Sequence, residues 1–399
     1  MDLYFQIAIC FAAIGIAAML AEKTRLFFAP FYILAGLLLG PSVLNVVNNY
    51  EIISLLGEIG VVFLLFFLGL EFSIHTLLKQ KKTMVIAGLI DFVINFSLGF
   101  ALGLVLGLSV FFSMVIAGAI YMSSSGIITK SLIELQINKK PEGHLVMGIM
   151  VFEDLVMILF LVFVSTGIQP GAQLDIGAAL LQLLISIVFC GAILFVAKKA
   201  SRFLDKILSI RKKELLLLTF FGLVLLITAA GKYLGISEAL VAFFLGIAFS
   251  NTKNVKNIES STITFRDLFG SIFFFSFGMM LKLADIFTYL DLILYFMIIA
   301  IVGKLISSFL ITRILKCEDH MSLFIGFITI PRGEFSLLIS RMSAASMPFI
   351  GPVMIVLAIF TTVVSSLVLK FSKLLCKVYN ICIVFPRSRI EDNKWGEMD

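Results

Sequence analysis

Two adjacent carboxylates, Glu153 and Asp154, lie inside a long apolar run that extends from residue 144 to residue 167. Ionised carboxylate oxygens are hard ligands that suit a small monovalent cation. Burial disfavours the charged form of a carboxylate, and a second carboxylate nearby disfavours it further, so a proton can compete for the same oxygens at physiological pH. The pair therefore predicts a site at which protons and a monovalent cation exchange.

Four other charges lie in apolar runs: Asp91, Lys304, Arg332 and Glu334. Charges inside a bilayer are costly, so each needs a partner or a function. We expect Lys304 to pair with a carboxylate of the site while the cation is absent. We expect Arg332 and Glu334 to balance the ends of an interrupted helix rather than to bind the ion. Asp91 has no assigned role, and hydrogen bonding between helices is favoured over ion binding.

Two apolar runs are interrupted by polar or helix-breaking residues. They read Met122-Ser123-Ser124-Ser125-Gly126 and Thr329-Ile330-Pro331-Arg332-Gly333-Glu334. Proline removes a backbone donor and glycine loosens a turn, so Pro331 and Gly333 mark the second break. Half-helix ends expose unpaired backbone groups and partial charges that help to coordinate an ion. Ser123, Ser124 and Ser125 are candidate cation ligands through their hydroxyl or carbonyl oxygens.

Purely structural interpretations stay open for these residues. The carboxylate pair could form a structural ion pair, and Lys304 could only stabilise a neighbouring helix. Serine runs in membrane helices also serve close packing.

The composition places these residues in a membrane protein. Of the 399 residues, 60% are apolar and only 14% are charged, whereas soluble domains carry about 25% charged residues. Apolar runs of about 20 residues are long enough to cross a bilayer as helices. Thirteen such runs are expected, at 4–21, 28–46, 52–70, 83–107, 110–136, 144–167, 176–197, 214–232, 236–250, 266–282, 286–312, 319–344 and 349–375. They predict one transmembrane domain at 1–375 and a short tail at 376–399.

The order of these segments indicates an inverted repeat. Segments one to six and eight to thirteen form two units of opposite orientation, so the interrupted fifth and twelfth segments correspond. Paired broken helices in inverted repeats are typical of a midplane ion site in secondary transporters. The expected fold is an all-α membrane protein of about thirteen spans, with two inverted six-helix repeats and crossed discontinuous helices. The repeat also places Asp91 and Lys304 in equivalent helices.

Lysine and arginine set the expected orientation. Alternate loops are rich in basic residues, most densely at Lys198, Lys199, Arg202, Lys206, Arg211, Lys212 and Lys213. The positive-inside rule then predicts an N-terminus outside and a C-terminus in the cytoplasm, in the plasma (inner) membrane. The basic excess faces anionic lipid, so no nucleic-acid partner is needed. We expect no enzymatic activity, no cofactor, and no metal other than the transported cation.

Several motifs together resemble the second branch of the monovalent cation:proton antiporters, which includes the Kef-type potassium exchangers. They are FLLFFLGLE at 63–71, the serines 123–125 followed by FED at 152–154, SEALVAFFLG at 237–246, FRDLFG at 265–270 running on to FGM at 277–279, and RGEFS at 332–336. The resemblance covers essentially the whole chain. It is closest to the Kht-type potassium/proton antiporter membrane subunits.

The resemblance implies a mobile core near 83–167 and 286–375, and a dimerisation scaffold near 4–70 and 214–282 joined by a linker helix at 176–197. It implies a homodimer that works by an elevator-like movement and favours potassium over sodium. Asp154 matches the ion-binding aspartate of the family, Glu153 precedes it, and Lys304 matches a basic residue that pairs with the site in some members. Only a short tail follows the last segment, so any regulation needs a separate soluble subunit.

Two other functions remain open from the sequence. An ion channel would need a pore or filter, and nothing resembles a repeated pore loop. A sodium-coupled solute symporter could share the inverted architecture, although adjacent carboxylates disfavour an anionic substrate near them.

Overall fold

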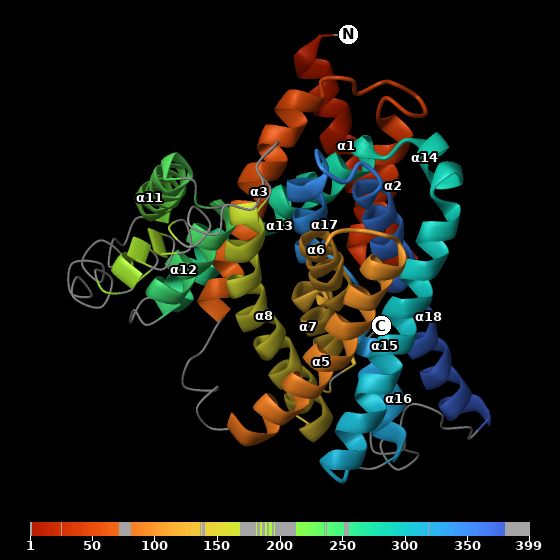
Figure 1. Cartoon of the computed structure of the whole chain (residues 1–399). Helices are drawn as coiled ribbons and strands as arrows, with labels where there is room; N and C mark the ends of the chain where they lie inside the picture. Colours follow the sequence, from red (N-terminus) through yellow and green to blue (C-terminus); the bar gives the residue numbers. More distant parts are fainter. Residues whose placement is uncertain are drawn as a thin grey trace.

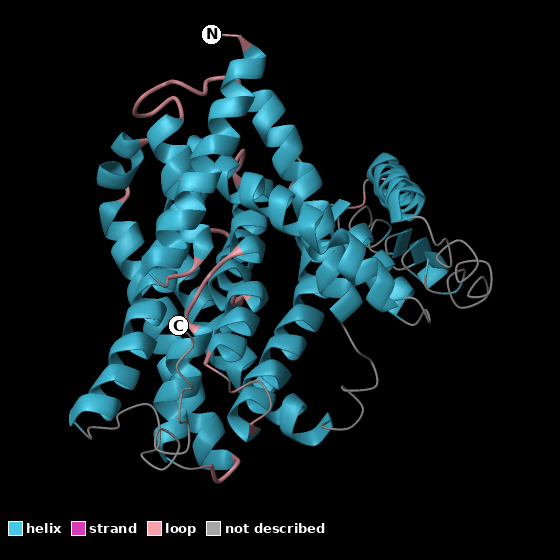
Figure 2. Cartoon of the chain, turned by 180° about the vertical axis from the view of Figure 1, so that it is seen from behind, coloured by secondary structure: helices cyan, strands magenta, loops and turns pink. Residues whose placement is uncertain are grey.

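The computed structural model describes residues 2–24, 26–71, 81–135, 137, 140–167, 213–234, 236, 238–250, 255–317 and 319–379, together with residues 181, 184–185, 188–189, 191–193 and 195 of the segment between. The described residues form helices joined by loops, with no strand among them (Figure 2). The all-α fold expected from the sequence is confirmed.

The helices follow the apolar runs. In chain order they are α1 (Leu3–Thr24), α2 (Phe28–Leu39), α3 (Tyr50–Glu71), α5 (Lys81–Val105), α6 (Val110–Tyr121), α7 (Ser125–Glu134), α8 (Pro141–Gly167), α11 (Lys213–Tyr233), α12 (Glu238–Ser250), α13 (Val255–Met280), α14 (Leu283–Thr288), α15 (Leu290–Ile314), α16 (Asp319–Thr329), α17 (Glu334–Ser343) and α18 (Ile350–Tyr379). Among the described residues, five helices are long and apolar enough to span a membrane alone, and the bent pair α16–α17 makes a sixth span. A count of thirteen spans stays a prediction.

Some predicted boundaries were wrong. The segment expected at 28–46 ends as a helix at Leu39, because Pro41 cannot continue the helix after Gly40. The segment at 286–312 is split, with the short α14 before α15. The segment at 266–282 begins earlier, since α13 starts at Val255. Most of the linker helix expected at 176–197, and the tail after residue 379, lie outside the described residues.

The helices α1–α3 and α11–α13 form what we call the glycine-packed group. Figure 1 shows α11 and α12 at one edge of the molecule, beside α3 and α13. A Cβ atom at Gly278 of α13 would lie 1.9 Å from the Ile33 carbonyl oxygen of α2. Likewise, a Cβ atom at Gly246 of α12 would lie 2.0 Å from the Phe66 carbonyl oxygen of α3. Only glycine permits backbones to approach this closely, as in many membrane helix pairs.

The helices α5–α8 and α15–α18 form what we call the charged group. The α5 helix packs against α6, α8 and α15, and α17 packs against α6 and α18. This group contains both broken helices and all the buried charges considered above. Its helices overlap the ranges 83–167 and 286–375, which the family resemblance implies are the mobile core.

Polar contacts join the two groups at Lys370 of α18, which donates to the Thr24 carbonyl of α1 at 3.0 Å, and at Arg341 of α17. Arg341, in the last turn of α17, donates to the Glu58 carboxylate of α3 and, at 2.9 Å, to Ser54 Oγ. Lys232 of α11 lies 4.0 Å from Glu58 and pairs with Glu238 of α12 at 2.7 Å. The charged group is therefore tied to three helices of the glycine-packed group at this end of α17.

Candidate functional site

The two breaks in the chain cross each other inside the charged group. The first falls between α6 and α7, and the second between α16 and α17, whose axes differ by 42°. The Ser124 amide donates to the Pro331 carbonyl at 2.8 Å, and Ser123 Oγ donates to the Thr329 carbonyl at 2.8 Å. These hydrogen bonds to main-chain carbonyls hold the crossing together, so the two predicted breaks are in direct contact.

Small residues make this contact possible. A Cβ atom at Gly333 would lie 2.5 Å from Ser124 Oγ and 2.6 Å from Ser124 Cβ. Pro331 has no amide proton, yet its carbonyl is free to accept from the opposite break. The predicted break residues Pro331 and Gly333 therefore shape the crossing and present no side chain that could bind an ion.

Glu334 lies between the amino ends of two half-helices. It is the first residue of α17, and its carboxylate oxygens accept from Ser124 Oγ at 2.7 Å and from Ser125 Oγ at 3.4 Å. Ser124 also accepts from the Ile127 amide at 3.4 Å, as an N-cap of α7. A carboxylate is stabilised at helix amino ends, where the partial charge is positive. The Ser124 and Ser125 hydroxyls thus bond Glu334.

Arg332 lies at the carboxyl end of α16 and is fully buried. Its Nη1 donates to the carbonyls of Thr329 at 3.2 Å and Ile330 at 3.1 Å. Its Nη2 donates to the Ala300 carbonyl of α15 at 3.4 Å. A cation is favourable at a helix carboxyl end. Arg332, a cation, therefore lies at the negative carboxyl end of one half-helix, and Glu334, an anion, lies at the positive amino end of another.

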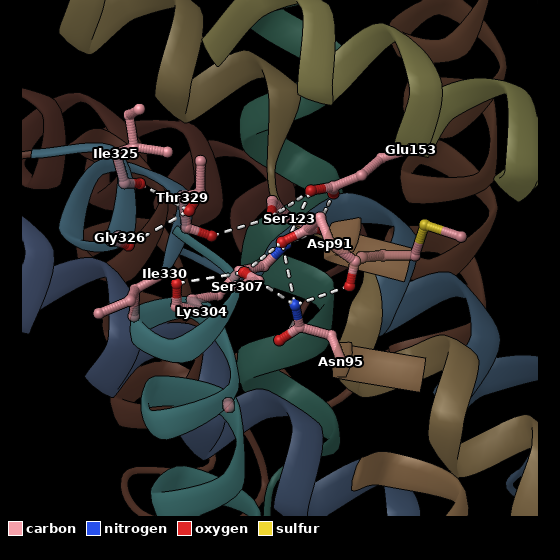
Figure 3. Close-up of polar contacts among 12 residues, drawn as sticks. Asp91, Asn95, Ser123, Glu153, Lys304, Ser307, Ile325, Gly326, Thr329 and Ile330 are labelled. Atoms are coloured by element: carbon pink, nitrogen blue, oxygen red, sulfur yellow. Dashed lines mark hydrogen bonds and ion pairs between the residues drawn. The ribbon is translucent and has the colours of Figure 1, made fainter. Parts of the chain in front are cut away.

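Lys304 of α15 lies beside the crossing and bonds two carboxylates at once (Figure 3). Its Nζ is 2.8 Å from Glu153 Oε1 on α8 and 2.7 Å from Asp91 Oδ2 on α5. The Tyr121 ring of α6 lies under the ammonium, with its centroid 5.4 Å from Nζ. Lys304 is 0% exposed, and both carboxylates are 2% exposed. Side chains of four helices therefore meet at this buried ammonium.

Glu153 connects this cluster to the first break. Its Oε2 accepts from the Ser123 amide at 2.6 Å, and its Oε1 lies 3.0 Å from Ser123 Oγ, whose single proton it shares with the Thr329 carbonyl. The next residue, Asp154, is also buried, with 7% of its surface exposed. Of the predicted serines, Ser123 bonds Glu153, whereas Ser124 and Ser125 bond Glu334.

The residues present can therefore hold a proton or a small cation. Carboxylate and hydroxyl oxygens meet at Glu153 beside the Thr329 carbonyl, and the Lys304 ammonium lies 2.8 Å from the Glu153 carboxylate. Displacement of that ammonium from Glu153 frees an oxygen ligand without breaking a helix. Among the described residues, no group of three or more His, Cys, Asp or Glu side chains could hold a resident metal ion.

A family model identifies the chain. The sodium/hydrogen exchanger transmembrane model matches residues 9–372. The chain belongs to this exchanger family. Its members are transporters, which agrees with the expected lack of enzymatic activity.

Individual relatives extend this assignment. The exchanger chain is 34% identical to the K(+)/H(+) antiporter subunit KhtU of Bacillus subtilis, over 94% of this chain and 96% of the relative. It is 29% identical to the ammonium/H(+) antiporter subunit AmhT of Alkalihalophilus pseudofirmus, over 80% and 82% of the two chains. The solved sodium proton antiporter MjNhaP1 of Methanocaldococcus jannaschii has a similar fold, with a TM-score of 0.66, 19% identity, and coverage of 93% and 97%.

Sequence reasoning left several site residues of this exchanger chain unassigned. Asp91, which has no assigned role in the sequence analysis, forms an ion pair with Lys304. Asn95 and Ser307, which both bond Asp91, were not predicted at all. Their spacing was the available signal, because Asn95 lies four residues after Asp91 and Ser307 lies three after Lys304, on the same helix faces.

Proposed function

We propose that the chain is a secondary active transporter that exchanges a monovalent cation for protons by alternating access, with potassium favoured over sodium. The observation that carries the proposal is the buried Lys304 ammonium, held by carboxylates of two helices beside the crossing of two broken helices. A buried ionisable cluster of this kind is costly inside a membrane, so its presence points to a functional site. Membership in the sodium/hydrogen exchanger family supports the same function.

The proposed ion and proton site is Glu153 and Asp154, with oxygen ligands from Ser123, Ser124 or Ser125. Ser123 is best placed for this role, because its hydroxyl lies between Glu153 and the Thr329 carbonyl. Lys304 is the counter-charge that leaves Glu153 when the cation arrives. Arg332 and Glu334 hold the half-helix ends in place around the site.

The choice of potassium rests on the relatives. The name of KhtU specifies potassium and that of AmhT specifies ammonium, both as antiporter subunits. Potassium and ammonium have similar charge and size, so a site for one suits the other. We therefore place potassium first, with ammonium as a second cation to be tried and sodium as the comparison.

The word "subunit" in both names also supports a partner chain. We propose a homodimer whose basic cytoplasmic loops receive a separate soluble regulatory subunit. The core (83–167 and 286–375) moves against a scaffold (4–70 and 214–282), in the plasma membrane, with the N-terminus outside and the C-terminus in the cytoplasm. The direct contact of Arg341 with Glu58 is consistent with two bodies that meet across one interface.

Reconstitution into liposomes that contain a pH-sensitive dye tests the function. Addition of potassium, ammonium or sodium in turn should change the internal pH, with the largest change for potassium. Asp154→Asn should abolish the response and keep a folded protein, while Asp291→Asn, at an exposed carboxylate on α15, should keep it. Absence of any cation-driven pH change in the unaltered chain would rule out exchange, and cation-selective single-channel currents would indicate a channel.

A further inference from the structure

The end of α17 that lies away from the crossing reaches across to the glycine-packed group. There Arg341 donates to the Glu58 carboxylate of α3 and, at 2.9 Å, to Ser54 Oγ. The ion pair is partly exposed, with 24% of the Arg341 side chain and 33% of the Glu58 side chain accessible. The contact of Lys370 with the Thr24 carbonyl also joins the groups, but both of its residues are exposed. Arg341 therefore joins the two groups by charge and by hydrogen bonding together.

Glu58 belongs to a part of α3 that is held firmly against α13. A Cβ atom at Gly57 would lie 2.8 Å from Ser276 Oγ. A Cβ atom at Gly60 would lie 2.2 Å from the Phe269 carbonyl oxygen. Such close helix packing on both sides of Glu58 leaves its backbone little room to shift. Glu58 is therefore the fixed half of the ion pair.

Arg341 is the half that can move, because its helix begins at the crossing. It lies about two turns after Glu334, the first residue of α17. The same crossing carries α7, since the Ser124 amide donates to the Pro331 carbonyl and Ser124 Oγ donates to Glu334. A displacement of the crossing is therefore transmitted to Arg341 and to α7 together.

The two half-helices lead away from the crossing on opposite sides. The α17 helix runs beside α6, where Ser336 Oγ donates to the Ala119 carbonyl at 2.8 Å, whereas α7 packs against α16. Figure 1 shows α6 and α17 above α7 and α16. On the α7 side, Ile127 meets the glycine-packed group in a small apolar cluster with Phe27 and Ala29, at the start of α2. The groups thus meet through an ion pair on one side and through apolar contacts on the other.

A second cation lies close to Glu58. Lys232, in the last turn of α11, is 4.0 Å from the Glu58 carboxylate and 2.7 Å from that of Glu238 on α12. Its side chain is 62% exposed, and exposed side chains change rotamer within nanoseconds. Lys232 can therefore take the place of Arg341, so departure of the guanidinium does not leave Glu58 without a cation.

We propose that Arg341 and Glu58 form a latch that holds the charged group in its present position, and that the latch opens when Lys232 replaces Arg341 beside Glu58. This inference rests on the proposed function, because the latch controls the movement that alternating access requires. Opening frees α17, and the crossing then carries α7 away from Ala29. The latch lies away from Glu153, so it sets how often the core moves and leaves the choice of ion unchanged.

A thiol introduced by Ala29→Cys reports this movement from the other side of the crossing. The five native cysteines are replaced first, and a charged maleimide is added to the purified chain. The thiol is buried beside Ile127 while the latch is closed, so its labelling rate follows the open fraction. Arg341→Gln should raise this rate about two- to fivefold, which is the range for a partly exposed ion pair. Lys232→Gln should lower it by a similar factor, because Glu58 then lacks its replacement cation.

Two further variants and a second measurement sharpen the test. Glu238→Gln releases Lys232 toward Glu58 and should raise the labelling rate by less than Arg341→Gln does. Glu51→Gln, at an exposed position in the first turn of α3, should leave it unchanged. Potassium-driven and sodium-driven exchange are measured in proteoliposomes of the same variants. The preference between the two cations should remain that of the unaltered chain.

Equal labelling rates in Arg341→Gln and the unaltered latch would overturn the inference. A shift of the same sign in Lys232→Gln and Arg341→Gln would also overturn it, as would a changed cation preference in either variant. If the unaltered chain exchanges potassium while all labelling rates stay equal, the proposed function stands and the contact is structural only. An unaltered chain that shows no potassium-driven pH change would overturn the proposed function, whatever the labelling rates.

Discussion

The glycine-packed group and the charged group solve the same problem, the packing of helices in lipid, by different chemistry. In the first, backbones touch at Gly278 and Gly246, where even a methyl group has no room. In the second, α5 and α6 also approach closely at Gly103, but α5, α8 and α15 meet through side chains, with Lys304 between Asp91 and Glu153. Backbone contact of the first kind permits one arrangement only. Hydrogen bonds of the second kind can be exchanged one for another, so they suit the region proposed to bind and release an ion.

The repeat makes this comparison sharper. The α2–α13 and α3–α12 contacts join the second predicted segment to the tenth and the third to the ninth. The two pairs are therefore equivalent under the inverted repeat, and both rely on glycine. In the charged group the equivalent helices α5 and α15 carry opposite charges, Asp91 and Lys304. Equivalent positions of the repeat thus form similar glycine contacts in one group, whereas in the other they carry opposite charges that form an ion pair.

The largest expected effect comes from removal of the shared ammonium. Lys304→Gln leaves Asp91 and Glu153 buried without their cation, so the free energy of unfolding should fall by about 3–5 kcal/mol. Thermal unfolding in detergent would measure the loss. Lys282→Gln, at an exposed position, is the matched control and should be neutral. Equal melting temperatures for the two variants would show that the buried cluster contributes nothing to stability.

A methyl group in the glycine-packed group should have the next largest effect. Gly278→Ala places a Cβ atom 1.9 Å from the Ile33 carbonyl oxygen, so α2 and α13 must separate. Such overpacking costs about 1–3 kcal/mol of stability. Gly222→Ala on α11, where no atom lies within 4 Å of the new methyl, should not destabilise. The comparison between the groups would fail if both alanines were equally well tolerated.

The crossing in the charged group offers a milder perturbation. Gly333→Ala brings a Cβ atom to 2.5 Å from Ser124 Oγ, so the two breaks must shift apart. We expect a stability loss of about 1–2 kcal/mol and slower exchange, since Ser123 moves with Ser124. Gly351→Ala on α18, which has open space around it, is the control. Undiminished exchange in Gly333→Ala would show that the crossing tolerates displacement.

The contact of Arg341 with Glu58 between the groups should have the smallest effect on stability. Arg341 and Glu58 are partly exposed, with 24% and 33% of their side chains accessible, so Arg341→Gln should cost less than about 1 kcal/mol. Exchange should be more sensitive than the melting temperature, because the contact joins the two bodies that are proposed to move. Glu51→Gln, at an exposed position of α3, provides the control. A change in stability with no change in exchange would argue that this interface is static.

The sequence predicted the architecture well because membrane helices are recognised from hydropathy. The two breaks are recognised from Pro331, Gly333 and the serines. Helix ends were harder, since α2 stops within an apolar run whose hydropathy continues past Pro41. The ion pair of Asp91 with Lys304 was also beyond reach. Apolar spacing shows that a charge is buried, but the partner depends on which faces of two distant helices meet.

The main-chain bond between Ser124 and Pro331 has a consequence for biosynthesis. The Ser124 hydroxyl and Glu334 lie 210 positions apart in the chain, and the neighbouring backbone bond spans a similar interval. A ribosome therefore completes the first break long before the residues that satisfy it exist. Until the second half is inserted, the Ser124 amide must find another partner, such as water held near the nascent segment. The site is assembled last, and chains truncated before the second break should remain immature and open to proteolysis.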